Sequence, residues 1–261
     1  MKIVVLIQAR MGSSRLPGKV LLDIAGKPMI MHVADRSGQS RLINDIVVAT
    51  STNEKDDAIE AFCSKQNLKC YRGSEDDIVD RLFKAARAHR ADIVLRVWGD
   101  CPLIDPFLID KGISLFIKEE ADYLNNFFPQ KSFPHGFEFE VYSVHALEDI
   151  EKTTRDNFFR EFPFEYIGKN KDRFKSVNLK NGRDLSQSGN FTVDYPQDVE
   201  VISSILQHFS RYKKKFGFED VVAFCKGHKE VVERNKNLER DIEYKKQLLK
   251  RKDIGNSTVR R

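Results

Sequence analysis

The chain has 261 residues, 41% of them apolar and 32% charged, which is enough for one large core and at most a small appended subdomain. Its apolar runs are short, the longest covering residues 3–7, so we expect no membrane insertion. The net charge is +5, but residues 226–261 hold 12 Lys and Arg against 6 Asp and Glu while residues 1–225 sum to −1, so a nucleic-acid-binding protein is not expected.

The first half of the chain alternates predicted strands and helices. Residues 2–9 and 44–49 are near-continuous apolar runs, typical of strands buried on both faces. A helix opening at Lys27-Pro28 lies between them. The alternation continues with helices at 54–66 and 76–90 and strands at 69–71 and 92–98. This order predicts a mostly parallel α/β sheet.

After Pro106 the pattern changes. A helix runs to about residue 118, a strand lies near Tyr123, and residues 137–142 alternate with period two, which predicts an inserted antiparallel hairpin. The remaining predicted elements are helices at 145–152, 157–168, 196–208 and from 218 onward, and strands at 174–179 and 190–193.

These elements predict a single domain over residues 1–225, with an insertion at about 120–180, and a basic helical tail over 226–261. The tail alternates charge signs with few apolar anchors, which is typical of a solvated helix, and contact with an acidic polymer or a membrane surface is the alternative. The four cysteines show neither paired spacing nor histidines at metal-ligand intervals, which indicates reduced thiols and a cytoplasmic location.

The strongest local signal is QARMGSSRLPGK at residues 8–19, which begins where the first predicted strand ends. Ligands bind at the carboxyl ends of strands in open α/β sheets, where Gly and Ser let backbone N–H groups wrap a phosphate. Arg10, Arg15 and Lys19 supply the density of donors that a triphosphate needs. The alternative is an ordinary basic surface loop. The P-loop and dinucleotide-binding glycine motifs are both absent.

Residues 8–19, followed by LLDIAGKPMI at 21–30, resemble the opening of the cytidylyltransferases, which include the CMP-KDO synthetase, CMP-acylneuraminate synthetase and spore-coat polysaccharide (SpsF) types. The SpsF type is the closest of these, and the resemblance covers about residues 1–210. It implies a Rossmann-like sheet flanked by helices, the GT-A-like architecture of nucleotide-diphospho-sugar transferases. It also implies that CTP binds at Ala9, Arg10, Met11, Gly12, Ser13, Ser14, Arg15 and Lys19.

The segment YRGSEDDIVDR at residues 71–81 is similar to the SpsF-type segment that follows the third strand. The resemblance implies nucleoside contacts from Arg72, Asp80 and Arg81, with Arg72 on the cytosine. A buried Asp80–Arg81 ion pair that only holds the helix is the alternative.

Two further segments carry aspartates. WGDCPLIDP at residues 98–106 matches the family's strand-end aspartate, with Gly-Asp-Cys-Pro where the KDO enzymes have Gly-Asp-Glu-Pro. FTVDYPQDVE at 191–200 is similar to the family's Val-Asp-Thr-Pro-Glu-Asp-Leu-Glu. Asp100 and Asp194 are therefore the expected ligands of Mg²⁺, which usually takes one or two carboxylates together with substrate phosphates. For Asp194 alone, a plain helix cap is the alternative.

The reaction that the resemblance implies needs no enzyme nucleophile. An acceptor hydroxyl attacks the α-phosphorus in line, with Lys19, Arg10, Asp100 and Asp194 as the catalytic residues. Arg10, Arg15 and Lys19 then stabilise the departing pyrophosphate, with backbone N–H groups from Met11 to Ser14 assisting. The sequence carries neither Gly-x-Ser-x-Gly nor His-Glu-x-x-His, which agrees with this scheme.

The acceptor should lie over the insertion, which is also expected to serve dimerisation. The predicted acceptor residues are Asn125, Asn126, His135, Glu138, Glu140, Arg155 and Arg160. His135 lies in a Pro-His-Gly turn, and the two arginines suit a carboxylate, although an idle turn histidine and solvated helix arginines are the alternatives.

The sequence thus predicts a CTP-dependent cytidylyltransferase that transfers CMP to a sugar acid for surface polysaccharide biosynthesis. Its partners would be CTP, the sugar acid and a second copy in a homodimer. A GT-A glycosyltransferase is the first alternative, with Glu75-Asp76-Asp77 as its acidic motif, although these residues also suit a helix start. The second alternative is a nucleic-acid-binding protein that uses the basic tail.

Overall fold

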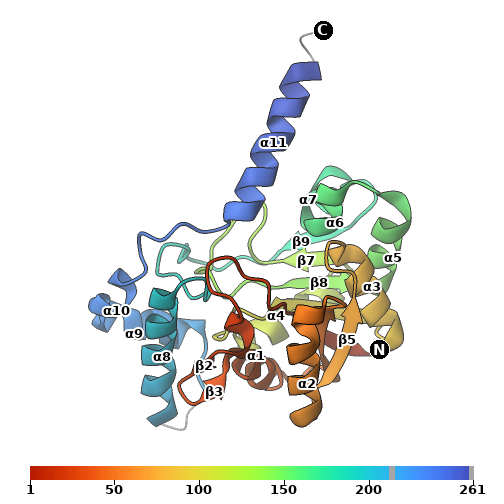
Figure 1. Cartoon of the computed structure of the whole chain (residues 1–261). Helices are drawn as coiled ribbons and strands as arrows, with labels where there is room; N and C mark the ends of the chain where they lie inside the picture. Colours follow the sequence, from red (N-terminus) through yellow and green to blue (C-terminus); the bar gives the residue numbers. More distant parts are fainter. Residues whose placement is uncertain (212–214, 259–261) are drawn as a thin grey trace.

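A central sheet organises the chain, whose computed structural model describes residues 1–211 and 215–258 (Figure 1). Within those residues the main sheet has seven strands, in the order β5 (Lys69–Gly73), β4 (Asp45–Ser51), β1 (Ile3–Gln8), β6 (Ile93–Trp98), β8 (Glu140–Ser143), β7 (Tyr123–Asn125) and β9 (Ser176–Asn178). β5, β4, β1 and β6 are parallel, β8 is antiparallel to both of its neighbours, and β9 is parallel to β7. The predicted mostly parallel sheet with an antiparallel hairpin is confirmed, and the hairpin continues the main sheet.

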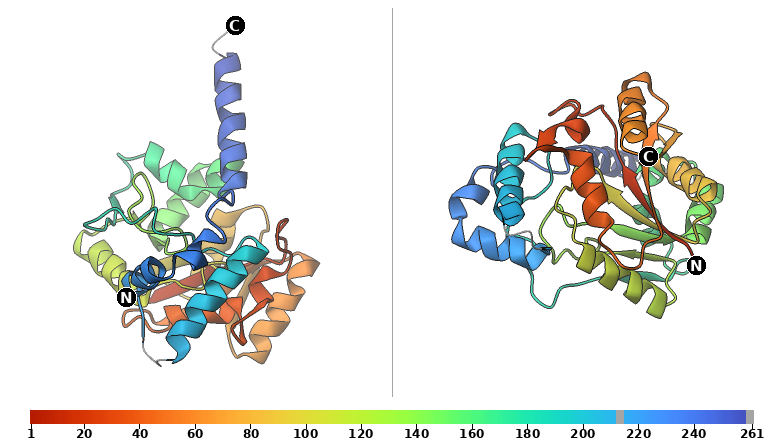
Figure 2. Two further views of the ribbon diagram at one scale, coloured as in Figure 1. Left: turned by 90° about the vertical axis from the view of Figure 1, so that its left-hand side faces the viewer. Right: turned by 90° about the horizontal axis from the view of Figure 1, so that it is seen from below.

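Helices cover both faces of the sheet, as the views in Figures 1 and 2 show. One face packs against α1 (Met29–Ser37), α2 (Asp57–Lys65), α4 (Pro106–Lys118), α8 (Pro196–Arg211) and α9 (Phe218–Gly227), and the other against α3 (Ile78–Ala88), α5 (Val144–Thr153) and α7 (Pro163–Lys169). Ile3, Val5 and Ile7 of β1 enter the first core, and Val4 and Leu6 enter the second. A strand covered on both faces needs apolar side chains at every position, which explains the unbroken apolar run.

Several elements differ from the predictions, among them the helix expected from 218 onward, which is divided into three helices that begin at residues 218, 229 and 242. The first helix begins at Met29, because β3 (Lys27–Pro28) pairs with β2 (Asp23–Ile24). The helix predicted over 157–168 is divided into α6 (Asn157–Glu161) and α7, because Pro163 lacks an N–H and disfavours a helical Phe162 before it. The strand predicted at 190–193 is reduced to one bridge between His135 and Asn190.

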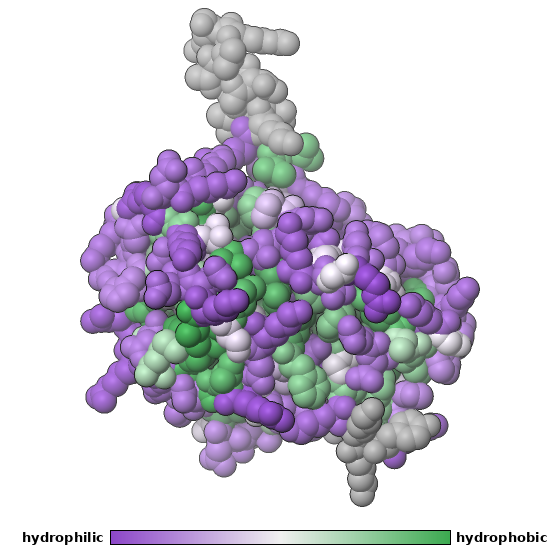
Figure 3. All heavy atoms as spheres, turned by 180° about the vertical axis from the view of Figure 1, so that it is seen from behind, coloured by the Kyte–Doolittle hydropathy of each residue, from purple (hydrophilic) through white to green (hydrophobic). Residues whose placement is uncertain are grey.

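The tail begins on the body of the protein. α10 (Lys229–Glu233) buries Val231, and the chain beyond it buries Asn235 and Arg240. α11 (Ile242–Thr258) then projects away from the body in both Figure 1 and Figure 2. Figure 3 shows the face opposite that of Figure 1 as largely hydrophilic, with apolar side chains visible near the base of this helix. The tail up to Arg240 is therefore not the solvated helix that its charge pattern predicted.

Candidate active site

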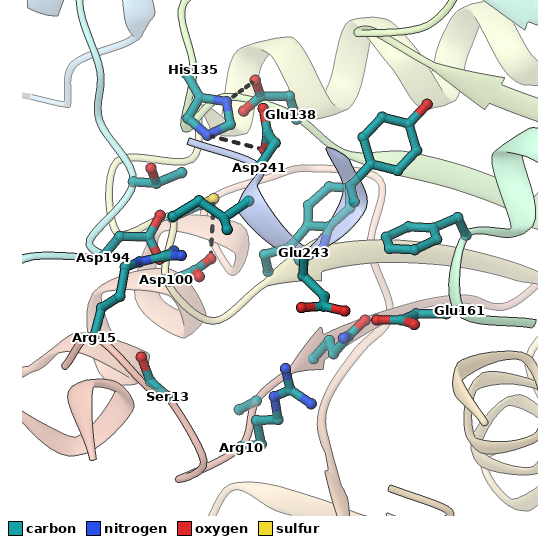
Figure 4. A pocket seen from close by; sticks show the side chains of 18 of the residues that line it. Arg10, Ser13, Arg15, Asp100, His135, Glu138, Glu161, Asp194, Asp241 and Glu243 are labelled. Carbon is teal, nitrogen blue, oxygen red and sulfur yellow. Dashed lines mark hydrogen bonds and ion pairs between the residues drawn. The ribbon is translucent and has the colours of Figure 1, made fainter. Parts of the chain in front are cut away.

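A cavity of about 970 Å³ lies at the carboxyl ends of β1 and β6, where ligands bind in open α/β sheets (Figure 4). The loop after β1 contributes Ala9, Arg10, Gly12, Ser13, Ser14, Arg15 and Lys19 to its lining. Met11 is not one of the lining residues, and its backbone N–H donates to Asp56 Oδ1 at 2.7 Å. The structure thus brings together most of the predicted phosphate loop, but the N–H of Met11 is already used, as is that of Ser13, which donates to the Met11 carbonyl at 2.9 Å.

Lys19 is the best-anchored cation of this loop. Gly18 before it has φ of 71°, a conformation that favours glycine, and the chain then enters the short helix η1 (Lys19–Leu21). Lys19 Nζ donates to Asp100 Oδ2 at 2.7 Å, to Asp194 Oδ1 at 2.8 Å and to the Val193 carbonyl at 2.8 Å. Burial alone would lower the pKa of Lys19, but the two carboxylates outweigh it and raise that pKa above its ordinary value.

Asp194 is held in its charged form. Arg15 Nη2 lies 2.6 Å from Asp194 Oδ1, on the same oxygen that Lys19 contacts. Burial alone would raise the pKa of Asp194, but Lys19 and Arg15 lower it to about 2. The backbone N–H groups of Asp194 and Tyr195 both donate to Asp198 Oδ2 at 2.8 Å, which fixes the backbone of Asp194 at the start of α8. The Asp194 side chain itself pairs with Lys19 and Arg15 and lines the cavity.

Asp100 and Asp194 have the geometry of a shared cation site. One oxygen of each lies within 2.8 Å of the same ammonium nitrogen, although Asp100 follows β6 and Asp194 precedes α8. Within residues 1–211 and 215–258 no group of three or more His, Cys, Asp or Glu side chains could hold a metal by itself. Two carboxylates that rely on substrate phosphates for the remaining ligands fit the usual chemistry of Mg²⁺.

The structure places the predicted nucleoside residues outside this cavity. Arg72 donates to the carbonyls of Ser51 and Asn53, at 3.0 Å each, and pairs with the carboxylates of Asp57 and Glu60 in α2. Asp80 pairs with Lys84 at 2.7 Å. Arg81 is buried and donates to the Ser74 carbonyl at 2.5 Å, so the alternative Asp80–Arg81 ion pair is not formed either.

On the acceptor side, the cavity receives His135 and Glu138. Glu138 is buried and accepts from Lys131 Nζ at 2.5 Å, from His135 Nδ1 at 2.8 Å and from the Gly136 N–H at 2.5 Å. Burial alone would lower the pKa of His135, but the Glu138 carboxylate outweighs burial and raises that pKa above its ordinary value. The pKa of Glu138 is held well below its usual range by His135 and Lys131 against the effect of burial. Lys131 and His135 thus share one carboxylate, and Lys131 Nζ also lies 2.9 Å from His135 Nδ1.

The His135 turn depends on a glycine. Gly136 has φ of 102°, and a Cβ there would lie 2.5 Å from the carbonyl carbon of Phe191. Only glycine both adopts this conformation readily and allows so close an approach. The turn is thereby fixed next to the strand-end segment that carries Asp194.

The other predicted acceptor residues lie away from the cavity. Asn125 is buried and its Oδ1 accepts from the backbone N–H groups of Phe127 and Phe128, at 2.9 and 2.6 Å. Asn126 is also buried and bonds to the backbone of Phe137 and Phe139. Arg155 donates to the Glu151 carbonyl at 2.5 Å, and Arg160 donates to Asp77 Oδ2 at 2.5 Å, beside a neighbouring smaller pocket.

Glu140 is fully buried and bonds to a side chain that lines the cavity. It accepts from Arg96 Nη1 and from the hydroxyls of Tyr123 and Tyr142, each at 2.7 Å. Arg96 lies 4.8 Å from the ring centroid of Trp98, and both of these side chains line the cavity. Glu140 thus positions lining residues without lining the cavity itself.

Replacing Glu140 with glutamine is expected to lower the free energy of unfolding by about 3–5 kcal/mol, because it leaves the buried Arg96 guanidinium without a charged partner. Urea denaturation measures this change. Glu148→Gln is the matched control, since its ion pair with Lys152 lies at the surface and should contribute little. Equal midpoints for the two variants would contradict the supporting role of Glu140.

Sequence reasoning missed the aromatic part of the lining. Phe127, Phe128, Phe162, Phe164 and Tyr244 all line the cavity. The sequence contains Phe-Phe-Pro at 127–129 and Phe-Pro-Phe at 162–164, but no periodic pattern indicates that these two segments lie on the same cavity. Tyr244 lies in the predicted tail, which was not connected with the site.

A model of the cytidylyltransferase family matches residues 4–254 of the sequence. This chain belongs to the cytidylyltransferase family. It is therefore a nucleotidyltransferase, as predicted. The family match extends through the tail, well beyond the 1–210 region that carried the resemblance.

Individual relatives agree with this assignment. A solved structure of a cytidylyltransferase from Leptospira borgpetersenii covers 92% of this chain and all of its own, with 31% identity and a TM-score of 0.84. The spore coat polysaccharide biosynthesis protein SpsF of Bacillus subtilis is 32% identical over 78% of this chain and 86% of its own length. The 3-deoxy-manno-octulosonate cytidylyltransferase of Geobacter metallireducens is 37% identical over 46% of this chain and 47% of its own length. Two of the three types named in the sequence analysis, the SpsF type and the KDO type, are thus among its relatives.

The described helices include none with the length and apolar character needed to cross a membrane.

Proposed function

We propose that this cytidylyltransferase transfers CMP from CTP to a hydroxyl of a sugar acid, with Mg²⁺ and release of pyrophosphate, for surface polysaccharide biosynthesis. The observation that carries the proposal is the convergence of Lys19, Asp100 and Asp194 in the cavity at the carboxyl ends of β1 and β6, beside a basic loop. The relatives named for spore coat polysaccharide biosynthesis and for 3-deoxy-manno-octulosonate support the acceptor class.

Asp100 and Asp194 are the residues that would hold Mg²⁺, since one carboxylate oxygen of each already faces the ammonium of Lys19. When bound, Mg²⁺ supplies charge neutralisation at the phosphates. Lys19 and Arg15 then have the phosphate oxygens as alternative partners to these carboxylates. The acceptor hydroxyl oxygen bonds to the α-phosphorus and releases its proton to water, the bond from that phosphorus to the bridging oxygen breaks, and Arg10 with Lys19 stabilises the leaving pyrophosphate.

Lys131 and His135 are suited to the acceptor carboxylate. Their N–H groups already hold the carboxylate of Glu138, and His135 Nε2 lies 3.9 Å from Asp241 Oδ1, so the same donors can be offered to the carboxylate of an acceptor. Both residues line the same cavity as the strand-end aspartates. A sugar acid that meets this cluster would be oriented by its carboxylate, in place of the predicted contact with Arg155 and Arg160.

Glu75, Asp76 and Asp77, the acidic motif of the glycosyltransferase alternative, lie at the start of α3. Asp77 is the N-cap of α3 and accepts from the Asp80 N–H at 2.9 Å, and its other oxygen accepts from Arg160. Only Asp76 of the three acidic residues lines the main cavity. The helix-start interpretation of this motif is therefore supported.

Pyrophosphate release from CTP, ATP, GTP and UTP with Mg²⁺, against a panel of sugar acids, tests the proposal. CTP should be preferred, and Asp100→Asn and Asp194→Asn should each slow release by about 10²–10³-fold, because a bound metal supplies several kcal/mol of charge stabilisation. Asp35→Asn is the matched control, since Asp35 is exposed and pairs only with Lys27 among the described contacts. A preference for UTP, or full activity of Asp100→Asn, would refute the assigned base or metal site.

The homodimer and the cytoplasmic location remain predictions from the sequence.

A further inference from the structure

The chain that precedes α11 is tied to the segment that carries Asp194. Asp198, fully buried in α8, accepts from Asn235 Nδ2 at 2.8 Å and from Arg240 Nη2 at 2.5 Å on one oxygen. Its other oxygen accepts from Arg240 Nη1 at 2.8 Å and from the N–H groups of Asp194 and Tyr195. Asn235 is 1% and Arg240 8% exposed, so this connection is an internal one. The tail therefore leaves the body from a fixed point beside the reaction site.

The first two turns of α11 then pack against α6 and α7. The Tyr244 ring lies 5.1 Å from Phe162 and 5.6 Å from Phe164 by centroid distance, and its hydroxyl donates to Glu165 at 2.5 Å. Gln247 Nε2 donates to Glu161 Oε2 at 2.6 Å. These contacts are both apolar and polar, so they specify one position for the start of the helix.

This position closes one side of the cavity. Tyr244 and Gln247 line it together with Asp241 and Glu243, and Asp241 Oδ1 lies 3.9 Å from His135 Nε2 (Figure 4). The carboxylates of Asp241 and Glu243 accept hydrogen bonds from hydroxyl groups and would repel a triphosphate, while Lys246, which also lines the cavity, offers a cation to the single carboxylate of a sugar acid. An aromatic surface with a few polar groups is typical of the wall of a small-molecule site. The chemistry of this wall thus favours the acceptor over the nucleotide.

We propose that residues 241–247 form the acceptor-binding wall of this enzyme and determine which sugar acid it accepts. Tyr244 provides the apolar surface, Asp241 and Glu243 provide acceptors for sugar hydroxyls, and Asp198 with Arg240 holds the wall in register with Asp194. The inference rests on the proposed function, because it assigns the second substrate of that reaction.

Tyr244→Ala in the full chain tests the wall. The acceptor is the sugar acid of the panel that the wild type uses fastest, and its KM should rise about 10-fold or more, as for truncation of a buried aromatic contact residue. The Kd for CTP, followed by the fluorescence of Trp98, should stay within about twofold, since the nucleotide loop is untouched. Tyr244→Phe keeps the ring and should restore the wild-type KM. Leu249→Ala is the matched control, because Leu249 lies on the same helix and is 62% exposed.

The outcomes separate the two proposals. A wild type that binds no CTP refutes the proposed function. An unchanged acceptor KM in Tyr244→Ala, or a parallel rise in the Kd for CTP, overturns the wall alone. If Tyr244→Ala does not fold, Gln247→Ala gives the same comparison. CTP could bind although no acid in the panel is used. In that case, quenching of the Trp98 fluorescence by acrylamide tests the wall. Quenching should be stronger in Tyr244→Ala than in Leu249→Ala, and equal quenching in the two variants overturns the inference.

Discussion

Replacing Lys19 with methionine is expected to slow CMP transfer by about 10²–10³-fold, the size of effect seen when one positioned donor to developing charge is removed. The ammonium of Lys19 is fixed by Asp100, Asp194 and the Val193 carbonyl before substrate arrives, so it needs little reorganisation. Its raised pKa keeps it charged throughout the neutral range. Pyrophosphate release at saturating CTP and acceptor measures the loss.

Lys27→Met is the matched control for this experiment. Lys27 is a lysine of the same N-terminal region, but its side chain is 45% exposed and its partner Asp35 is 44% exposed. A surface pair of this kind contributes little to stability or to a distant site. If Lys19→Met retained full turnover while CTP still bound, the ammonium would have only a structural part in pairing the two aspartates.

The phosphate loop and the sheet were predictable because their signals are local. β1 has apolar side chains at every position since both of its faces are covered, and the loop that follows a strand of this kind must lie at its carboxyl end. The cations of that loop are only a few residues apart, so no long-range contact was needed to bring Arg15 and Lys19 to one place.

Glu140 shows why a period-two pattern misleads inside a mixed sheet. Its alternation with Val141 and Tyr142 predicted a polar face that could receive an acceptor. β8 instead lies between β6 and β7, with helices on both faces, so the polar position is satisfied by an internal guanidinium and two phenols. Arg96 comes from β6, and nothing in the sequence near Glu140 indicates this partner.

The tail was misjudged for a related reason. Alternating charges are typical of a solvated helix, but the partner of Arg240 is Asp198, 42 residues earlier in the chain, and Gln247 bonds to Glu161, 86 residues earlier. The charge pattern of one helix does not show whether residues of another segment neutralise those charges. The partners of Arg72 were hidden in the same way, since its donors are used by backbone carbonyls and carboxylates beside β5.

Replacing Asp198 with alanine is expected to lower the free energy of unfolding by about 3–5 kcal/mol, because it leaves the Arg240 guanidinium buried without its principal partner. The N–H groups of Asp194 and Tyr195 lose their acceptor at the same time. Urea denaturation measures the stability, and pyrophosphate release from the variant that is still folded measures the effect on the site. Glu200→Ala is the matched control, because Glu200 lies on the same helix with a side chain that is 63% exposed.

The combination of the two readouts decides what Asp198 does. Loss of stability together with slower turnover at saturating acceptor means that Asp198 positions Asp194, since the backbone of Asp194 is held by the same carboxylate oxygen that Arg240 contacts. Loss of stability with a raised acceptor KM and unchanged turnover means that it acts on the wall at residues 241–247. Unchanged stability would show that the connection between α8 and the tail is not maintained in solution, because a buried carboxylate with five donors cannot be removed from a formed network without cost.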